Sequence, residues 1–463
     1  MPEPEHRFVS PLRQHARAIW QAAVDASRPE DLLRAAFAHQ ALPLLEAVAG
    51  APRILVVGAG KAGAAMSAAL EEILRDDLDR LEGLVNVPAE TVRPLRAIRL
   101  HPARPAGTNQ PTAEGVAGAT EMLALLAGAG PDDVAVCLFS GGGSALLPAP
   151  VEGVPLEDKQ RITGTLHACG ATINEMNAVR KHLSRIKGGW LAKAFRGSAL
   201  FSLIISDVVG DPLDVIASGP TVPDPTTFAE ALAVLQKYSL LGPEGTKPDD
   251  SRVPRSVWYY LQEGAAGRKP ETPKTLPANI HHRVIGSNAK ALAAAGTKAI
   301  ALGYPVLNLG SFIEGETREV AKVLAGMVRS VHADAQPFAA PLCILSGGET
   351  TVTLAKQHGL GGRNQEFVLA AATHLGPAGF CNVVVLSGGT DGEDGPTDAA
   401  GAIADEHTLH AAQSKNLMLG AFLARNDAYH FFEATGDLLK TGLTQTNVMD
   451  VRVILVGQSN AVR

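Results

Sequence analysis

Short apolar runs along the chain each end in a glycine-rich or polar turn, and most lead into stretches rich in Ala and Leu with a helical period. This alternation is typical of a parallel β-sheet covered by helices, so the predicted class is α/β. Because the runs are continuously apolar, we expect strands that are buried on both faces. Three of them lead into the same turn, Ser-Gly-Gly. The predicted strands with their turns are 53–63, 134–144, 202–211, 342–349 and 382–390.

The alternation breaks between about residues 238 and 282, where the chain is polar and rich in proline, and it resumes at 283–288. We interpret the break as the connection between two α/β domains, with predicted ranges 1–240 and 241–463. In such sheets ligands bind beyond the carboxyl ends of the strands. The turns that follow the predicted strands are therefore the first places to look for chemistry.

Composition narrows the class of protein. With 463 residues, 46% of them hydrophobic, the chain can bury a sizeable core. Its 41 Lys and Arg against 47 Asp and Glu, without a basic stripe, argue against nucleic-acid binding. The four cysteines form no C-x-x-C pair, which argues for a reducing compartment and against a zinc or disulfide framework. The chain shows neither a signal peptide nor a long apolar span, so we expect a cytoplasmic protein without a membrane partner.

The first candidate site is the turn with Gly58, Gly60 and Gly63, which matches G-x-G-x-x-G and favours dinucleotide binding. However, Lys61 stands inside the turn, and the next strand-like run leads into Pro88 without the acid that would hold a ribose. The residues therefore predict close backbone amides beside an ammonium, which suits an anion. A tight turn with a solvated lysine is the structural alternative.

The second candidate is Ser140-Gly-Gly-Gly-Ser144, where convergent amides and two hydroxyls favour a phosphate or carboxylate. A flexible turn explains it less well, because three glycines cost backbone entropy without adding packing. Farther along, a helical period places Arg180 and Lys187 roughly on one face. This basic face either binds an anionic ligand or is exposed to solvent.

Arg363 follows a Gly-Gly pair, and a guanidinium presented from such a turn can stabilise charge on a transferring phosphoryl group. A surface arginine is the alternative. Acidic turns hold Asp207 and Asp211 after one predicted strand, and Asp391 and Asp394 after another. They predict a divalent cation held by carboxylates and phosphate oxygens, or else turns whose aspartates bond their own backbone.

Taken together, these segments resemble the glycerate 2-kinase family, the class II glycerate kinases with a C-terminal MOFRL domain. The segments that carry the resemblance, in family order, are 58–63, 140–146, 179–184 with 186–189, 206–211, 218–221, 361–366 and 389–397. The resemblance implies a Rossmann-like first domain, with a parallel sheet and helices on both faces, and a smaller mixed α/β second domain of MOFRL type. It also implies an active site in the cleft between them.

The resemblance further implies transfer of a phosphoryl group from ATP to the 2-hydroxyl of D-glycerate, with Mg²⁺, to give 2-phosphoglycerate. It points to Lys61 and Arg363 as catalytic, and to Asp207, Asp211, Asp391 or Asp394 as metal ligands. The residues expected to bind substrate or nucleotide are Gly58, Gly60, Ser140, Gly141, Gly142, Gly143, Ser144, Arg180, Lys187, Ser218, Gly219, Glu349 and Asn364.

Two other functions compete with the kinase. Some relatives have been named hydroxypyruvate reductases, so an NAD(P)H-dependent reductase is the main alternative. The missing ribose-binding acid and the abundance of anion loops favour the kinase. A sugar-acid-binding regulator would need a helix-turn-helix with a basic face, which the sequence lacks. The sequence also allows a homodimer.

Overall fold

The computed structural model describes residues 10–38, 43–105, 110–242 and 252–458. They form two compact units, Pro29–Ile285 on one side and the residues up to Arg28 together with Gly286–Arg463 on the other. The passages between the units therefore lie at residues 28–29 and 285–286, whereas the sequence pattern placed one boundary at residue 240.

Packing explains the difference in boundaries. The segment after residue 240 contributes Val257 and Leu261 to a core that also holds Val179 and Phe228, so it stays with the first strands. The N-terminal helix instead sends the Trp20 indole nitrogen to the carbonyl of Gly388, 3.1 Å away and far along the chain.

The unit Pro29–Ile285 is built on a six-stranded sheet with the order β3-β2-β1-β4-β5-β6. The pairings of β3 with β2, β2 with β1, β1 with β4 and β4 with β5 are parallel. This confirms the predicted parallel sheet and gives the strand order of a Rossmann-like fold. The strands are β1 (Ile54–Ala59), β2 (Leu81–Pro88), β3 (Ile98–Arg104), β4 (Val134–Phe139), β5 (Ala199–Ile205) and β6 (Ile280–Gly286).

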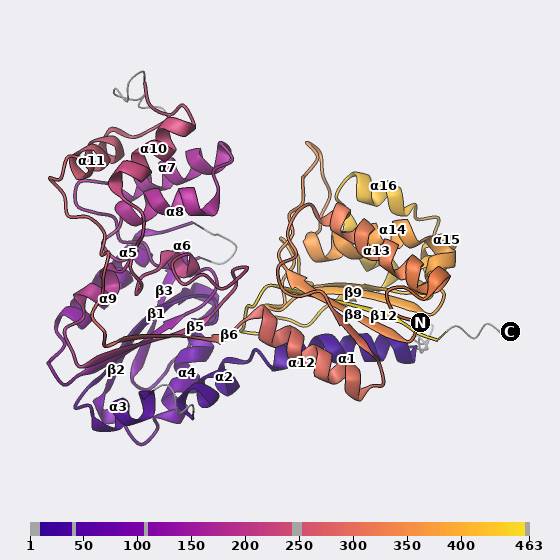
Figure 1. Cartoon of the computed structure of the whole chain (residues 1–463), viewed down its shortest axis with the longest axis horizontal. Coiled ribbons are helices and arrows are strands. Elements are labelled where there is room, and N and C mark those ends of the chain that lie inside the picture. Colours follow the sequence, from indigo (N-terminus) through magenta and orange to yellow (C-terminus); the bar gives the residue numbers. More distant parts are fainter. Residues whose placement is uncertain (1–9, 39–42, 106–109, 243–251, 459–463) are drawn as a thin grey trace, which may run out of the picture. The chain divides into compact units, whose positions relative to one another are not determined.

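Helices lie on both faces of this sheet (Figure 1), as predicted. Leu55 and Val57 of β1 share a buried cluster with Met122 and Leu126 of the helix after β3. The helices and 3-10 turns are α2 (Pro29–Phe37), α3 (Leu44–Gly50), α4 (Gly63–Ile73), η1 (Leu78–Arg80), η2 (Ala89–Thr91), α5 (Ala113–Ala127), α6 (Gly143–Leu146), α7 (Leu156–Ala168), α8 (Ile173–His182), α9 (Trp190–Ala194), η3 (Ile216–Ser218), α10 (Phe228–Lys237) and α11 (Arg255–Ala265).

Helices α7, α8, α10 and α11 pack together around a separate apolar cluster (Figure 1). Two of them begin with a capping box, in which Thr172 pairs with Glu175 and Thr227 pairs with Glu230. The sequence pattern did not separate this helical group from the strands around it.

The second unit has a sheet with the order β11-β10-β9-β12-β8-β7. Strand β12 is antiparallel to both of its neighbours, while β7 and β8 are parallel, so the sheet is mixed, as predicted. The strands are β7 (Val306–Asn308), β8 (Leu342–Gly348), β9 (Val383–Gly389), β10 (Gly401–Ala404), β11 (Leu438–Leu439) and β12 (Asp450–Val456). The helices are α1 (Pro11–Asp25), α12 (Asn288–Ala301), α13 (Thr317–Asp334), α14 (Arg363–Gly379), α15 (Glu406–Ser414), α16 (Leu419–Ala424) and α17 (Ala428–Thr435).

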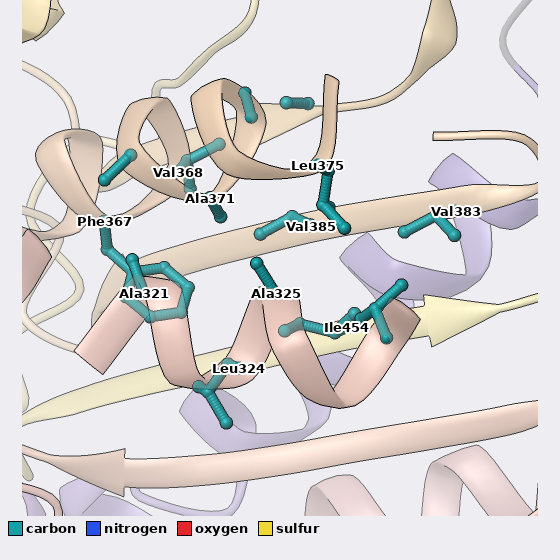
Figure 2. Packing of buried hydrophobic residues seen from close by; sticks show 14 of the residues in the cluster. Ala321, Leu324, Ala325, Phe367, Val368, Ala371, Leu375, Val383, Val385 and Ile454 are labelled. Carbon is teal, nitrogen blue, oxygen red and sulfur yellow. The ribbon is translucent and has the colours of Figure 1, made fainter. Parts of the chain in front are cut away.

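Helices α13 and α14 lie on one face of this sheet, and α1 and α12 lie on the other (Figure 1). Figure 2 shows the core of the first face, where Ala325 of α13 and Phe367 of α14 pack near Val385 and Ile454 of the sheet. In the part of the chain that the structure describes, no helix is both long enough and apolar enough to span a membrane.

Candidate functional site

The two glycine loops that the sequence singled out are neighbours. Strands β1 and β4 lie side by side, and the loops follow their carboxyl ends. The Lys61 amide donates to the Gly141 carbonyl at 2.8 Å, and the Ala62 amide donates to the Ser140 hydroxyl at 3.0 Å. The strand order reverses direction between β1 and β4, which is where open α/β sheets hold their ligands.

The glycines of the first loop are required by packing. A Cβ on Gly58 would collide with the Leu138 carbonyl, and one on Gly60 would collide with the Ser140 hydroxyl. A Cβ on Gly63 would lie 3.0 Å from the side chains of Val85 and Val87, so this glycine lets α4 approach the sheet. The G-x-G-x-x-G spacing is therefore explained without a dinucleotide.

The amides of this loop are also engaged within the protein. Besides the two contacts with the second loop, the Gly60 amide donates to the Asn86 carbonyl at 3.3 Å and the Gly63 amide donates to the Gly60 carbonyl at 3.0 Å. We therefore revise the interpretation of the loop as a cradle of free amides. What it contributes toward an anion is the side chain of Lys61.

Two cations approach the second loop at Gly142. A Cβ built on this residue would lie 3.5 Å from Cγ of Lys61 and 3.9 Å from Nη2 of Arg104. Gly142 has a φ of +73°, so both its conformation and its surroundings favour glycine. Arg104, a buried residue at the end of β3, was not among the predicted site residues.

A chain of hydrogen bonds runs from this loop into α8. The hydroxyls of Ser144 and Ser218 lie 2.9 Å apart, and the Ser218 hydroxyl donates to Oδ1 of Asn177 at 3.0 Å. The same amide oxygen accepts from Nη1 of Arg180 at 3.3 Å. The predicted residues Ser144, Ser218 and Arg180 are thus brought together, with Asn177 as the residue that joins them.

The backbone around Ser218 is strained. Ala217, Ser218 and Gly219 have φ values of +51°, +62° and +60° in succession. Left-handed backbone is unfavourable for non-glycine residues, and it tends to persist where the surrounding structure fixes a functional geometry. This strain lies at the residues that the sequence predicted to bind substrate or nucleotide.

Two buried lysines complete the cationic cluster. Nζ of Lys187 donates to the carbonyls of Ser144 and Ala217 at 3.0 and 3.2 Å, and Nζ of Lys159 donates to the carbonyl of Leu183 at 2.9 Å. Among the described residues, no carboxylate pairs with Lys159, Arg180 or Lys187. Burial, together with repulsion from the neighbouring cations, lowers the pKa of Lys187 well below its usual range. Burial and the nearby Arg180 lower the pKa of Lys159 to about 7.

Lys181 shows the opposite arrangement on the same helix. Its Nζ lies 3.3 Å from Asp214 and 3.4 Å from the fully buried Asp224. Asp224 also accepts hydrogen bonds from Thr226 and Thr272. Lys181 is therefore paired within the fold, and its neighbour Arg180 is the residue of α8 that joins the cluster.

In the other unit, the predicted Arg363 begins α14 and is held by carboxylates. Its Nε and Nη2 donate to the two carboxylate oxygens of Asp450 at 2.7 and 3.0 Å, and its Nη1 lies 2.9 Å from Glu349. Burial alone would lower the pKa of Arg363, but these ion pairs raise it above the usual value.

Asp450 lies at the first residue of β12, between the Ser-Gly-Gly ends of two strands. It pairs with Gly348 of β8 and with Gly389 of β9. Its carboxylate also accepts from Nδ2 of Asn364 at 2.9 Å and lies 3.4 Å from the buried Arg452. The predicted Glu349, Arg363 and Asn364 are thus brought together around an aspartate that the sequence had not indicated.

Asp394 caps a helix. Its Oδ1 accepts from the Asn364 amide at 2.9 Å, and its Oδ2 accepts from the Gln365 amide at 2.8 Å, so both oxygens serve the first turn of α14. Burial raises the pKa of Asp394 to about 7 in spite of these bonds. Because its oxygens are engaged, we revise its predicted role from metal ligand to helix cap.

The other predicted aspartates lie in the loops after β5 and β9. Asp207 and Asp211 are half-buried in the loop after β5, and Oδ1 of Asp391 accepts from the Glu393 amide at 3.1 Å. Among the residues that the structure describes, no group of three or more His, Cys, Asp or Glu side chains is arranged to hold a metal ion.

One missed residue left a trace in the sequence pattern. Lys159, Ile162 and Leu166 are the buried residues of α7, at the spacing of a helix's inner face. A lysine on such a face would have indicated a buried cation. Asn177, Arg104 and Asp450 give no comparable local signal.

Two family models match the chain: "Domain of unknown function (DUF4147)" over residues 15–247 and "MOFRL family" over residues 342–450. The chain is 37% identical to a glycerate 2-kinase of Pyrococcus horikoshii over 87% of each protein, and 36% identical to the glycerate kinase of Bos taurus over 96% of this chain and 93% of that one. It is 41% identical to an Agrobacterium vitis protein with the provisional name hydroxypyruvate reductase, over 96% and 94% of the two chains.

A crystal structure of glycerate kinase from Thermotoga maritima matches with a TM-score of 0.81 and 34% identity, over 96% of this chain and 99% of that one. The first matched range holds β1 to β5, and the second begins at β8 and ends at Asp450.

Proposed function

This chain belongs to the glycerate 2-kinase family, and from that membership we propose that it transfers the γ-phosphoryl group of ATP to the 2-hydroxyl of D-glycerate. The products are ADP and 2-phosphoglycerate. Both substrates are anions, and the unit Pro29–Ile285 gathers cations beside the carboxyl ends of β1 and β4, where α/β sheets bind ligands. We place the reaction in the cytoplasm, because all four cysteines are free thiols, which is typical of reducing compartments.

One observation favours the kinase over the reductase. A dinucleotide site uses amides at the turn after β1 to bind the pyrophosphate. Here the amides of Gly60, Lys61, Ala62 and Gly63 all donate to acceptors within the protein. Strand β2 also ends at Pro88 without an acid at the position that would hold the ribose.

We propose Lys61 and Arg363 as the residues that stabilise charge on the transferring phosphoryl group. Phosphoryl transfer depends on positioning and electrostatic stabilisation more than on covalent chemistry, so an ammonium and a guanidinium that is held by carboxylates suit it. Asp450 holds one edge of the Arg363 guanidinium, and the half-exposed Glu349 holds another. A phosphoryl oxygen would take the place of Glu349 during the reaction. The two cations belong to different units of the chain.

We propose Asp207 and Asp211 as the residues that hold Mg²⁺. This ion usually keeps several waters and binds one or two carboxylates together with substrate phosphates. Two half-buried aspartates in one loop after β5, next to β4 in the sheet, fit that requirement. Bound there, Mg²⁺ would neutralise phosphate charge.

The test runs two assays on the same preparation. A coupled assay with ATP, Mg²⁺ and D-glycerate should detect ADP, and ³¹P NMR should identify 2-phosphoglycerate as the product. A parallel absorbance assay with NADH or NADPH and hydroxypyruvate should show no turnover. Reductase turnover without ADP release would overturn the proposal.

The metal arm uses the same coupled assay. Activity should be lost in excess EDTA and return with Mg²⁺, and Asp207→Asn should raise the Mg²⁺ concentration needed for half activity. Asp398→Asn is the matched control, since Asp398 pairs on the surface with Lys440. Full activity in EDTA would exclude the metal role.

A further inference from the structure

Lys159, Arg180 and Lys187 form a cluster of buried or half-buried basic side chains, and among the described residues no carboxylate pairs with any of them. The side chains of Lys159 and Lys187 are only 5% and 1% exposed. Repulsion from Arg180 opposes the charged form of Lys159. Repulsion from Arg180 and Lys159 opposes the charged form of Lys187. Their hydrogen-bond acceptors in the described chain are carbonyl or amide oxygens, which carry no full charge.

Within the described chain, the cluster also leaves hydrogen-bond donors without acceptors. A lysine ammonium has three N–H groups, of which the structure uses two on Lys187 and one on Lys159. Nδ2 of Asn177 is buried without a hydrogen-bond partner, although Oδ1 of the same side chain accepts two bonds. The guanidinium of Arg180 can only donate, so this orientation of the amide is fixed, and its NH₂ group faces a place where an acceptor is missing.

Such an arrangement is unfavourable for the fold alone. A buried cation is stabilised by an opposite charge, and a buried donor without an acceptor costs desolvation free energy. An anion that binds between these groups would supply both the charge and the acceptors. Functional sites commonly retain features of this kind at the expense of stability.

We propose that Lys159, Arg180, Lys187 and Nδ2 of Asn177 form a binding site for a small oxyanion. The inference rests on the proposed function, in which two oxyanions enter the reaction: the carboxylate of D-glycerate and the phosphoryl oxygens of ATP. Either one offers acceptors for the lysines, for the amide and for the planar fork of the guanidinium. The hydroxyl chain through Ser144 and Ser218 connects the site to the second glycine loop.

The decisive variant is Asn177→Asp, which places a permanent carboxylate beside Arg180 without changing the size of the side chain. The new carboxylate should take the place of the bound oxyanion. In buffer free of oxyanions the variant should melt at the same temperature as the wild type or higher, whereas a merely structural asparagine would lead to a lower melting temperature. Inorganic phosphate should raise the melting temperature of the wild type and leave that of the variant unchanged.

Steady-state kinetics then distinguish the two sources of the oxyanion. A rise of roughly 10-fold or more in KM for D-glycerate alone identifies the carboxylate, and the same rise for ATP alone identifies a phosphoryl group. Asn308→Asp, at an exposed asparagine, is the matched control and should change neither KM. Unchanged KM values for both substrates in Asn177→Asp, with phosphate still raising its melting temperature, would overturn the proposal.

Lys159→Met provides an independent variant if Asn177→Asp does not fold. It removes one of the like charges, so it should also lose the stabilisation by phosphate and show the same rise in KM. The exposed Lys193→Met is its control. If the wild type phosphorylates D-glycerate and Lys159→Met behaves like the wild type, the oxyanion site is wrong and the kinase proposal stands. A wild type that binds phosphate through Lys159 but does not phosphorylate D-glycerate would remove the kinase and keep the site.

Discussion

Among the described residues, each unit buries one long cationic side chain to 1% exposure, Lys187 in one and Arg452 in the other, and only Arg452 has a carboxylate beside it. Arg452 lies 3.4 Å from the Asp450 carboxylate and donates to the carbonyl of Gly347. Lys187 meets carbonyls, and the charges nearest to it are cations.

This difference shows that burial of a cationic side chain does not by itself indicate a ligand-binding site. Where the fold supplies the counter-charge, as Asp450 does for Arg363 and Arg452, the network fixes geometry. Where the fold leaves the counter-charge out, as around Lys159 and Lys187, the stabilising partner has to come from outside. We therefore expect loss of the counter-charge in the first network to affect stability most, and mutations in the second group to affect binding and turnover.

The largest expected effect is on the paired side. Asp450→Asn removes the counter-charge of two arginines, and breaking a buried ion pair costs roughly 3–5 kcal/mol because the remaining charge is left uncompensated. The free energy of unfolding, measured by urea denaturation, should fall by that amount. Asp398→Asn, which breaks an exposed pair with Lys440, should leave the urea midpoint nearly unchanged. Equal effects of the two variants would contradict the contrast.

The next effect is on turnover and concerns Lys61 in the unit Pro29–Ile285. Lys61→Ala should lower kcat/KM for glycerate phosphorylation by roughly 10² or more while the melting temperature stays close to that of the wild type. The reason is that the side chain of Lys61, whose Cγ approaches Gly142, would bring an ammonium to the second glycine loop and neutralise charge that develops in the reaction. Lys298→Ala, at an exposed lysine, is the control. A Lys61→Ala enzyme of near wild-type kcat/KM would make Lys61 a solvated turn residue.

A smaller effect sharpens the role of the ion pair at Arg363. Arg363→Lys keeps the charge but cannot reproduce the contacts of Nε and Nη2 with both oxygens of Asp450. The variant should retain its fold and lose roughly 10- to 50-fold in kcat/KM. The matched control is Arg329→Lys, an exposed arginine of α13. Wild-type kinetics of Arg363→Lys would show that its planar geometry has no part in the reaction.

The sequence predicted local features of the fold well. The apolar runs gave β1, β4, β5, β8 and β9, because a strand buried on both faces has to be continuously apolar. Two of these strands, β8 and β9, end in Ser-Gly-Gly, and β4 leads into it. The strand directions in the second sheet were not readable in the same way, because the antiparallel β12 has the same apolar pattern as its neighbours.

The contacts that could not be predicted are those between distant parts of the chain. Arg13 bonds the carbonyl of Ile403, 390 residues away, and this packing assigns α1 to the unit that holds the C-terminal strands. Within the candidate sites, the turn residues Ser144 and Arg363 were identified because glycine-rich turns are locally visible. Asp394 was assigned to a metal, since a turn aspartate that caps a distant helix has the same sequence as one that binds an ion.

The smallest expected effect is on the pH dependence of the free energy of unfolding, and it tests the buried Lys159. Burial and Arg180 lower the pKa of Lys159 from 10.5 to about 7, so between these values the unfolded chain binds a proton that the folded chain does not. Stability should therefore rise with pH across this window, by at most about 1.4 kcal/mol per pH unit from this group, and the rise should end near the unfolded pKa. Urea denaturation in oxyanion-free buffer at pH 7.5, 8.5 and 9.5 measures the slope for the wild type and for Lys159→Met. Other groups titrate in both proteins, so the difference between the two slopes reports Lys159 together with the repulsion that it exerts on Lys187. Lys193→Met should keep the wild-type slope. A Lys159→Met slope equal to that of the wild type would mean that the pKa of Lys159 is the same in the folded and the unfolded protein.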